Sequence, residues 1–536
     1  MILHRILASK PAFWLFLALL AVGKMAVVWN QSVAVVLGPH DDSLYVSRAL
    51  SLLAGNGFGP YTSSTLLKFP GLSIWLAGGT LLELPYLRSL NFLYAAAGLY
   101  LCSALRSTGA PRYAIATGYL LYLFNPFTFD IGWTRILREP LATVLLTTIL
   151  ASLLSLMSSV WRGRILSLHF GVFVAALAFA SLVREEDVLL LLIPILAAAF
   201  LAVAAPGGRQ CWAQAALLGA VPLVVAAITH AAVGTFVERH YGTPLRHDFG
   251  EGEFPKMVAA MRSIASKRDN RYVMISQETL AALRREVPRL EPVIRRLPQP
   301  SRSTVSCEWL GVCTEWASGW LPFWIKDAAY DAGLTPDLPS GQAFFRAVRE
   351  DIARACASGR LACTPKGDGL IPPFELRWAR ALAQEAGRLL HMLAWPERFA
   401  RQTPTSAHGP RLDALFAAAT GSIVTAAPAA PPVKQEMPFG RGLRQVYGWM
   451  AFALIAGMIG VCVLVLWSSR QLPRGPLAVC ICALAGYVGV RLALLSYIAI
   501  TMGRYDPRMV MSSHILLVAL APCIIILSLD WRREKK

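Results

Sequence analysis

Long apolar runs recur along this sequence, and they constrain its fold more than any other feature. A helix needs roughly 20 apolar residues to cross the hydrocarbon core of a bilayer, and the runs reach or approach that length. Hydrophobic residues make up 55% of the 536 positions, more than one water-soluble core can hide. We therefore predict an all-α polytopic membrane protein with about ten transmembrane helices. The predicted spans are residues 13–29, 87–105, 113–129, 141–160, 166–183, 188–205, 212–236, 446–467, 477–500 and 510–527.

The basic residues between these spans predict their orientation. One further apolar piece, residues 71–84, is too short to cross a bilayer, and we interpret it as a juxtamembrane helix on the outer face. With this piece excluded, the basic segments next to the spans fall on one side of the membrane, as the positive-inside rule requires. Both termini are then expected in the cytoplasm, and the first span is expected to be a retained signal anchor.

The alternation of apolar and polar segments predicts three regions. An N-terminal membrane region covers residues 1–237 and carries an outer loop at 30–86. A polar region at 238–445 is expected to form a small, mainly helical domain on the outer side, and residues 446–536 return to the membrane. The Ala- and Pro-rich stretch at 407–438 is expected to be a flexible return to the bilayer.

Helical spacing of apolar residues predicts most of the structure of the polar region. One short segment, "RYVMIS" at 271–276, has the composition of a strand. Gly359 is expected to end the third predicted helix. The predicted helices are residues 254–265, 277–287, 342–357 and 374–393.

The net charge of the chain is strongly positive, with 51 Lys and Arg residues against 32 Asp and Glu, a formal charge of +19. These basic residues lie between hydrophobic spans and do not form one stripe with aromatic residues, as a nucleic-acid surface would. Orientation in the membrane and contact with anionic lipid explain them better. We therefore expect membrane lipids, and no nucleic acid, as partners.

The polar region holds four of the ten cysteines. An even set in such a region favours two disulfides and an oxidising compartment. Zinc is the competing interpretation, although the spacings are looser than those of structural zinc sites. Four cysteines allow three pairings, and we favour the two that join near neighbours in sequence. These pairs are Cys307–Cys313 and Cys356–Cys363.

Two adjacent carboxylates, Asp41 and Asp42, follow the first span. They precede a segment, residues 43–54, whose apolar residues can line one face of a helix, so one Asp could serve as its N-cap. A cap needs only one Asp, and two carboxylates at a membrane surface repel each other and lose hydration. A general base or a metal ligand is therefore the sharper interpretation of the pair.

The segments after this pair carry a family resemblance. Tyr45, the small residue Ala49, the stretch "GNGFGPY" and Lys68 of "LKFPG" follow in order. Together with the acidic pair they resemble the GT-C glycosyltransferases that use polyprenyl-phosphate sugars, especially the aminoarabinose and protein mannosyl branches. The resemblance covers about residues 1–188. In those branches the first outer loop carries an acidic pair and a Lys-Pro-Pro-Leu-like stretch. Here Phe69 and Gly71 replace the first proline and the leucine.

The resemblance implies an inverting transferase with a GT-C-like helix bundle. Its donor would be a polyprenyl-phosphate sugar, and its acceptor a lipid, a glycan or a protein on the outer face of the bacterial inner membrane. It implies Asp41 and Asp42 as catalytic residues, with Asp41 as the base. A divalent metal, Mg²⁺ or Mn²⁺, is an optional cofactor of such a pair. The large domain would be periplasmic.

The chemistry of such a transfer also needs cations, because the leaving group is a lipid phosphate that gains charge. Basic residues predicted on the outer face are the candidates. They are Lys68, Arg135, Arg138, Arg184 and Arg504.

A second acidic loop follows the third predicted span in "FDIGWTRILREP". Asp130 and Glu139 are candidates for a catalytic role there. Helix punctuation is the alternative, since Glu139 followed by Pro140 suits the first turn of a helix. The run "REED" at 184–187 is equally consistent with a solvated turn.

Four tryptophans of the polar region could form a platform for sugar rings or lie in the membrane interface, which is the commoner use. They are Trp309, Trp316, Trp320 and Trp324.

Two other functions share this predicted topology. A transporter would place charged groups at mid-bilayer, yet Lys24 and Arg491 are the clear ionisable residues inside the predicted spans. A ligase or polymerase of lipid-linked polysaccharide would use histidine or arginine on a large outer loop. Its donor would be a lipid-linked oligosaccharide in place of a single sugar on a polyprenyl phosphate.

Overall fold

The structure is a computed structural model of the full chain. It describes residues 9–36, 40–160, 167–184, 187–204, 209–265, 271–300, 307, 311, 313–364, 370–395, 400–401, 410–422, 424, 435–436, 445–452, 455, 476–503 and 507–534.

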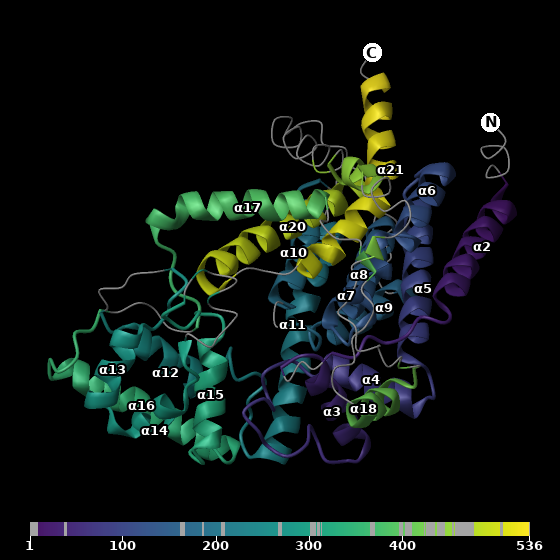
Figure 1. Cartoon of the computed structure of the whole chain (residues 1–536). Coiled ribbons are helices and arrows are strands. Elements are labelled where there is room, and N and C mark those ends of the chain that lie inside the picture. Colours follow the sequence, from purple (N-terminus) through teal and green to yellow (C-terminus); the bar gives the residue numbers. More distant parts are fainter. Residues whose placement is uncertain are drawn as a thin grey trace.

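Long apolar helices form one side of the molecule and lie side by side (Figure 1). Within the described part of the chain, four helices are long and apolar enough to cross a membrane, over Lys10–Val28, Arg138–Ser158, Trp212–Tyr241 and Ile481–Met502. The predicted all-α polytopic membrane fold is therefore confirmed. The helices of this bundle are α2 (Lys10–Val28), α5 (Tyr86–Ser107), α6 (Arg112–Leu123), α8 (Arg138–Val160), α9 (Leu168–Ala180), α10 (Asp187–Ala204), α11 (Arg209–Tyr241), α20 (Pro476–Met502) and α21 (Met511–Glu534).

One predicted span is shorter than expected. The apolar run at 113–129 predicts a single helix, but α6 ends at Leu123. Pro126 follows, and proline disfavours helical backbone in the residue before it. The Asn125 side chain accepts a hydrogen bond from the Phe127 amide (3.2 Å) and starts a separate 3-10 helix, η1 (Pro126–Phe129). The change of direction leads into the loop that holds Asp130.

The first loop, which we define as residues 30–85, contains two short helices. They are α3 (Asp42–Leu53) and α4 (Gly71–Leu81), and they pack against each other and against α18 (Pro410–Thr420). Figure 1 shows α18 beside α3 and α4, although it is far from them in sequence. The residues predicted as a juxtamembrane helix at 71–84 are thus largely helical, and their position relative to a bilayer stays a prediction.

Gly71 starts α4 where two backbones come close together. Its amide donates to the Leu182 carbonyl (2.7 Å), and a Cβ at this position would lie 2.6 Å from that oxygen. Only glycine fits such an approach. The replacement of leucine by glycine at this point of the resemblance therefore has a packing reason, and it brings the start of α4 next to the segment that carries Arg184.

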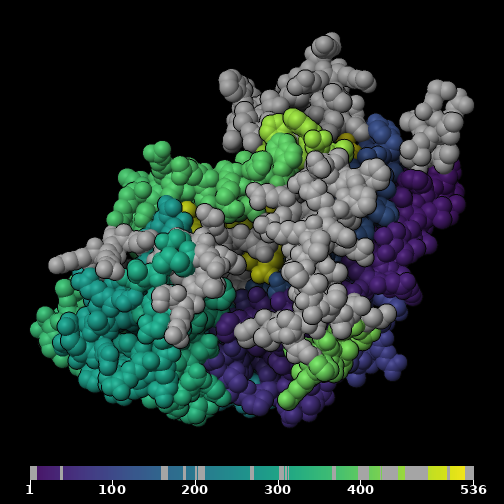
Figure 2. All heavy atoms as spheres, in the orientation of Figure 1, coloured from purple at the N-terminus to yellow at the C-terminus, as the bar shows by residue number. Residues whose placement is uncertain are grey.

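A second group of helices forms a domain with its own hydrophobic core, which we call the helical domain. Its core includes Phe254, Leu283, Ile325 and Val348. Its elements are α12 (Glu253–Arg262), α13 (Gln277–Glu286), η2 (Pro288–Leu290), α14 (Glu291–Arg296), α15 (Leu321–Asp331) and α16 (Leu338–Ala357). Figure 2 shows the surface of this domain next to that of the first loop.

The strand predicted at 271–276 is wrong, because these residues form turns and bends. The Ser276 side chain accepts a hydrogen bond from the Thr279 amide and caps α13, and Ile275 is buried in the domain core. This apolar segment is therefore not a strand. It buries Ile275 in the domain core just before α13 begins. Gly359 follows the end of α16 with a φ of +73°, so the predicted helix end is confirmed.

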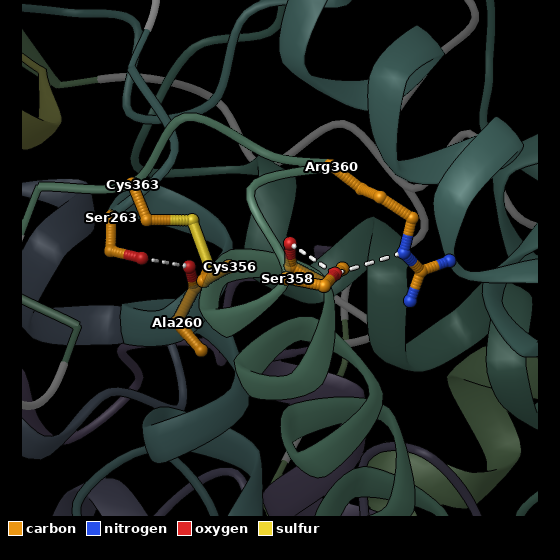
Figure 3. The surroundings of a disulfide bond; sticks show 7 residues. Ala260, Ser263, Cys356, Ser358, Arg360 and Cys363 are labelled. Atoms are coloured by element: carbon orange, nitrogen blue, oxygen red, sulfur yellow. Dashed lines mark hydrogen bonds between the residues drawn. A yellow bond between two sulfur atoms is a disulfide. The ribbon is translucent and has the colours of Figure 1, made fainter.

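Both disulfides that the spacing favoured are present, Cys307–Cys313 and Cys356–Cys363, so these cysteines do not form the alternative zinc site. In Figure 3 the second bond joins the end of α16 to a segment that pairs with the end of α12. The Thr364 amide donates to the Ser263 carbonyl (2.7 Å) across that junction. The bond therefore fastens two helices of the domain to each other.

The helix predicted at 374–393 is divided into η5 (Leu376–Trp378) and α17 (Ala379–Ala394). α17 runs alongside α20 (Figure 1). Its last turn reaches the bundle, where His514 donates through Nδ1 to the Leu393 carbonyl (2.7 Å). A two-residue antiparallel pair of strands, β1 (Ala400–Arg401) and β2 (Gln435–Glu436), lies beyond it in the chain.

Candidate functional site

The acidic pair lies at the start of α3. Asp41 is the N-cap residue and Asp42 is the first residue of the helix. Among the described residues of α3, no backbone amide donates a capping hydrogen bond to the Asp41 side chain. Capping therefore does not account for the Asp41 carboxylate, whose side-chain partners are charged residues.

Asp42 is fully buried and is bound to Arg135. Nε of Arg135 donates to Oδ1 (3.1 Å) and Nη2 donates to Oδ2 (2.6 Å), a bidentate pair. Burial raises the pKa of Asp42, while the Arg135 guanidinium opposes that shift. Both oxygens of this carboxylate are thus engaged by one arginine.

Arg135 is held in place by the chain on either side of it. It follows α7 (Ile131–Thr134), a single turn of helix. The Ala34 amide donates to the Thr134 carbonyl (3.1 Å), so the segment after α2 fixes the backbone next to Arg135. Two loops that are distant in sequence therefore set the Asp42–Arg135 pair.

Asp41 occupies a different environment. Its Oδ1 lies 3.9 Å from Nζ of Lys68, and its Oδ2 lies 3.8 Å from Nη2 of Arg508. The Asp41 side chain is 32% exposed, against 0% for Asp42. A carboxylate that lies between two cations and stays accessible can accept a proton from a bound molecule.

Lys68 is positioned by Arg48, a buried residue of α3. The Arg48 guanidinium donates to the carbonyls of Lys68 (2.9 Å), Ser64 (3.1 Å) and Thr65 (2.7 Å). Arg48 follows Asp41 by two helical turns, so it lies on the same face of α3. The helix that begins with Asp41 therefore also holds the loop that presents Lys68.

A buried acidic residue, Glu139, gathers further arginines at the start of α8. Arg508, Arg184 and Arg138 all interact with it electrostatically. Arg138 and Arg184 are themselves buried. Arg508, which lies in η6 (Pro507–Val510), is thus shared by Glu139 and Asp41 and joins the two carboxylates into one charged cluster.

Most of the site residues that the sequence predicted lie in this charged cluster. The cluster contains five cations and three carboxylates. This excess of positive charge suits the binding of an anionic group such as phosphate. Arg504 lies outside the described residues. The members of the cluster are Asp41, Asp42, Glu139, Lys68, Arg135, Arg138, Arg184 and Arg508.

Asp130 is the N-cap residue of α7. Its Oδ1 accepts a hydrogen bond from the Ile131 amide (2.7 Å), so it caps α7. It is still close to the cluster, because a Cβ built on Gly132 would lie 3.8 Å from both Oδ2 of Asp130 and Cβ of Arg508. Gly132 thus lies beside both Asp130 and Arg508.

Of the tryptophans of the helical domain that the structure describes, one is buried. Trp316 is buried and donates through Nε1 to the Pro298 carbonyl (2.9 Å), so neither a sugar platform nor a membrane-interface role is right for it. Trp324 packs against the domain core, and the ring of Trp320 lies 5.9 Å from that of Phe323. Trp309 lies outside the described residues.

The carboxylates of the cluster do not fit a divalent metal. Among the described residues, no group of three or more His, Cys, Asp or Glu side chains could hold an ion. Arg135 engages both oxygens of Asp42, and Lys68 and Arg508 flank Asp41. Mg²⁺ and Mn²⁺ prefer several oxygen ligands, which this arrangement of cations does not offer.

Sequence reasoning missed Arg48, which positions Lys68, and considered Arg508 for phosphate binding but preferred Arg504. "MGRYDPR" carries both Arg504 and Arg508, and the sequence alone favoured the first. Arg48 gave no signal, because an arginine within an amphipathic helix is ordinarily solvated.

Comparison with known proteins adds one structural similarity. The chain is similar to a crystal structure of ArnT from Cupriavidus metallidurans bound to undecaprenyl phosphate. The sequence identity is 15%, the match covers 92% of this chain and 79% of that chain, and the TM-score is 0.31. No family model and no curated protein sequence matches this chain.

Proposed function

We propose that this membrane protein is an inverting GT-C-type glycosyltransferase, which moves a sugar from a polyprenyl-phosphate donor to an acceptor hydroxyl at the outer face of the inner membrane. The observation that carries the proposal is the accessible carboxylate of Asp41 between the cations of Lys68 and Arg508. These three residues lie beside apolar helices, where a lipid-borne phosphate can reach them.

Asp41 is the general base in this mechanism. Its carboxylate takes the proton of the acceptor hydroxyl while the hydroxyl oxygen attacks the anomeric carbon. The bond between that carbon and the phosphate oxygen breaks, and the electron pair leaves with the lipid phosphate. Because attack and departure occur on opposite faces of the sugar ring, the anomeric configuration inverts.

The cations stabilise the leaving group. Negative charge grows on the phosphate as the bond breaks, and fixed cations at a partly dehydrated site lower the energy of that state. Lys68 and Arg508 flank Asp41 directly, and Arg184 belongs to the same cluster through Glu139. These are the residues to which we assign the phosphate.

Asp42 has a supporting role. It is fully buried and bidentate with Arg135, so it cannot receive a proton from an acceptor without breaking that pair. We assign it the placement of Arg135 beside the base. The mechanism contains no metal-dependent step.

The cellular arrangement is part of the same proposal. The helical domain and the first loop would face the periplasm, with both termini in the cytoplasm. The acceptor would be a lipid, a glycan or a protein on that side.

A transporter gains no support from Lys24 and Arg491, the two charged residues inside the predicted spans. Nζ of Lys24 donates to Oγ1 of Thr128 (2.7 Å) and lies 3.7 Å from the centroid of the Phe129 ring. Nη1 of Arg491 donates to Oγ of Ser513 (3.3 Å). Each charge thus has a partner inside the bundle that accounts for it structurally.

Donor analysis tests the proposal. Purified protein in nanodiscs is incubated with a panel of polyprenyl-phosphate monosaccharides and with extracts of candidate acceptors, and the consumed donor is identified by mass spectrometry. Release of polyprenyl phosphate with transfer of one sugar supports the proposal. Transfer only from a lipid-linked oligosaccharide would replace it with a polysaccharide ligase or polymerase.

A further inference from the structure

One helix of the helical domain, α15, packs directly on the first loop, close to the charged cluster (Figure 1). Asp327 accepts a hydrogen bond through Oδ1 from Oγ of Ser63 (2.5 Å). One turn further along, the hydroxyl of Tyr330 donates to the Tyr61 carbonyl (3.2 Å). Residues three apart share a helix face, so one side of α15 binds the loop just before Lys68.

A buried ion pair of α15 extends this contact to Leu66 and Leu67, the two residues before Lys68. Lys326 pairs with Asp248, and both side chains are almost completely buried. The Asp248 amide donates to the Leu66 carbonyl (3.0 Å), and Nε2 of His247 donates to the Leu67 carbonyl (2.9 Å). The residues immediately before Lys68 are therefore bound from the side of the helical domain as well as by Arg48.

The same helix also contacts the residue before the proposed base. Nε2 of His40 lies 3.9 Å from Oδ2 of Asp327, and its ring lies 5.0 Å from that of Phe323. Nδ1 of His40 is hydrogen-bonded to Oγ of Ser64 (3.3 Å). α15 thus contacts both chain segments that carry the ion pair of Asp41 and Lys68.

We propose that Asp327 is a positioning residue, which through Ser63 and His40 fixes Lys68 against Asp41 and so couples the helical domain to the transfer site. This inference rests on the proposed function. The ion pair of Lys68 and Asp41 spans 3.9 Å, and its two members come from segments of the first loop on either side of α3. Without Asp327 the loop of Lys68 loses its contacts through Ser63 and His40 and keeps those of Arg48, His247 and Asp248. Lys68 can then drift from the position where it meets the donor phosphate.

The kinetic test uses Asp327→Ala in the full-length protein. We expect KM for the polyprenyl-phosphate donor to rise about five- to tenfold, because small displacements of a positioned group are costly. KM for the acceptor should stay unchanged. In a Lys68→Ala background, Asp327→Ala should add no further loss, because the two changes act through the same cation. Additive losses would overturn the proposal.

Asp331→Ala is the matched control. It lies on the same helix, is exposed, and removes one carboxylate without touching the loop. Its donor KM should equal that of the wild type. If it has the same effect as Asp327→Ala, the change reflects the overall charge of α15 and the positioning role is refuted.

Hydrogen exchange supplies a readout that does not depend on transfer. The Thr65 and Leu67 amides are hydrogen-bonded within the loop, and Asp327→Ala should speed their exchange about tenfold. Unchanged exchange overturns the proposal, and so does faster exchange with an unchanged donor KM. If the wild type transfers no sugar, the proposed function fails and the positioning role falls with it. Exchange then reports only whether α15 holds the loop.

Discussion

Asp42 accepts two hydrogen bonds from Arg135, a residue 93 positions further along the chain, at 2.6 and 3.1 Å. Its neighbour Asp41 makes longer contacts with two other cations and keeps part of its surface accessible. Two adjacent carboxylates are thus assigned different tasks by their surroundings. Asp42 stabilises the site, and Asp41 remains available to a bound molecule.

This difference predicts that removing Arg135 damages stability first. Arg135→Met leaves the Asp42 carboxylate buried without its partner, which should lower the free energy of unfolding by about 3–5 kcal/mol. Urea unfolding in detergent micelles, followed by tryptophan fluorescence, measures the loss. Asp42→Asn combined with Arg135→Gln should recover much of it, because neutral groups are cheaper to bury. If the single variant were as stable as the wild type, the pair would have no structural role.

Asp41→Asn tests the base. Asparagine keeps the size of the side chain but cannot take up a proton. We expect folded protein whose rate of transfer is lower by roughly two to four orders of magnitude. Single-turnover assays with labelled donor measure the chemical step. Near-normal transfer by this variant would move the search for the base to Glu139.

The fold was predictable because its dominant signal is local. Apolar runs indicated the bundle, and helical spacing indicated the helices of the polar region. Among the described residues, four of the long runs form helices that are long and apolar enough to cross a membrane. Cysteine spacing indicated both disulfides. The errors arose where tertiary packing outweighed composition. Ile275 and Trp316 have strand-like or interface-like character in sequence, yet both lie in the core of the helical domain.

The site was predictable only in part, for a related reason. Residue type and position relative to the spans indicated Asp41, Asp42 and Lys68. The contacts that organise them join segments distant in sequence, such as Arg508 to Asp41 and Asp327 to Ser63. No periodicity encodes those pairings, so the contact of Arg508 with Asp41 had no local signal.

Lys68→Ala tests the phosphate contact. Loss of a fixed cation beside the leaving group should lower kcat/KM for the donor roughly ten- to a hundredfold. Lys68→Arg, which keeps the charge, should retain more activity than Lys68→Ala. Initial rates over a range of donor concentrations give the comparison. Equal rates for the wild type and Lys68→Ala would remove Lys68 from the phosphate site.

His40 predicts a pH dependence of stability. Burial lowers the pKa of His40 from its ordinary 6.5, although Asp327 and Asp41 act to raise it while Lys68 and Lys326 act to lower it further. The unfolded chain therefore binds a proton more readily than the folded chain. This contribution to stability is present above pH 6.5 and is lost as the pH falls through the lower pKa of the folded state.

The variant His40→Gln isolates this effect. Between about pH 8 and pH 5, the apparent melting temperature of the wild type should fall further than that of His40→Gln. Differential scanning fluorimetry in a detergent of constant composition makes the comparison. Parallel curves for the two proteins would show that His40 does not contribute to the pH dependence.

The orientation of the bundle is tested by labelling at two exposed positions. Asn56 lies in the first loop, after the end of α3, and Ser107 is the last residue of α5. The distribution of basic residues predicts opposite sides for them. In a variant whose cysteines outside the two disulfides are replaced, Asn56→Cys should react with an impermeant maleimide in intact spheroplasts. Ser107→Cys should react only after the membrane is permeabilised. Labelling of Ser107→Cys in sealed cells would reverse the topology and place the charged cluster on the cytoplasmic face.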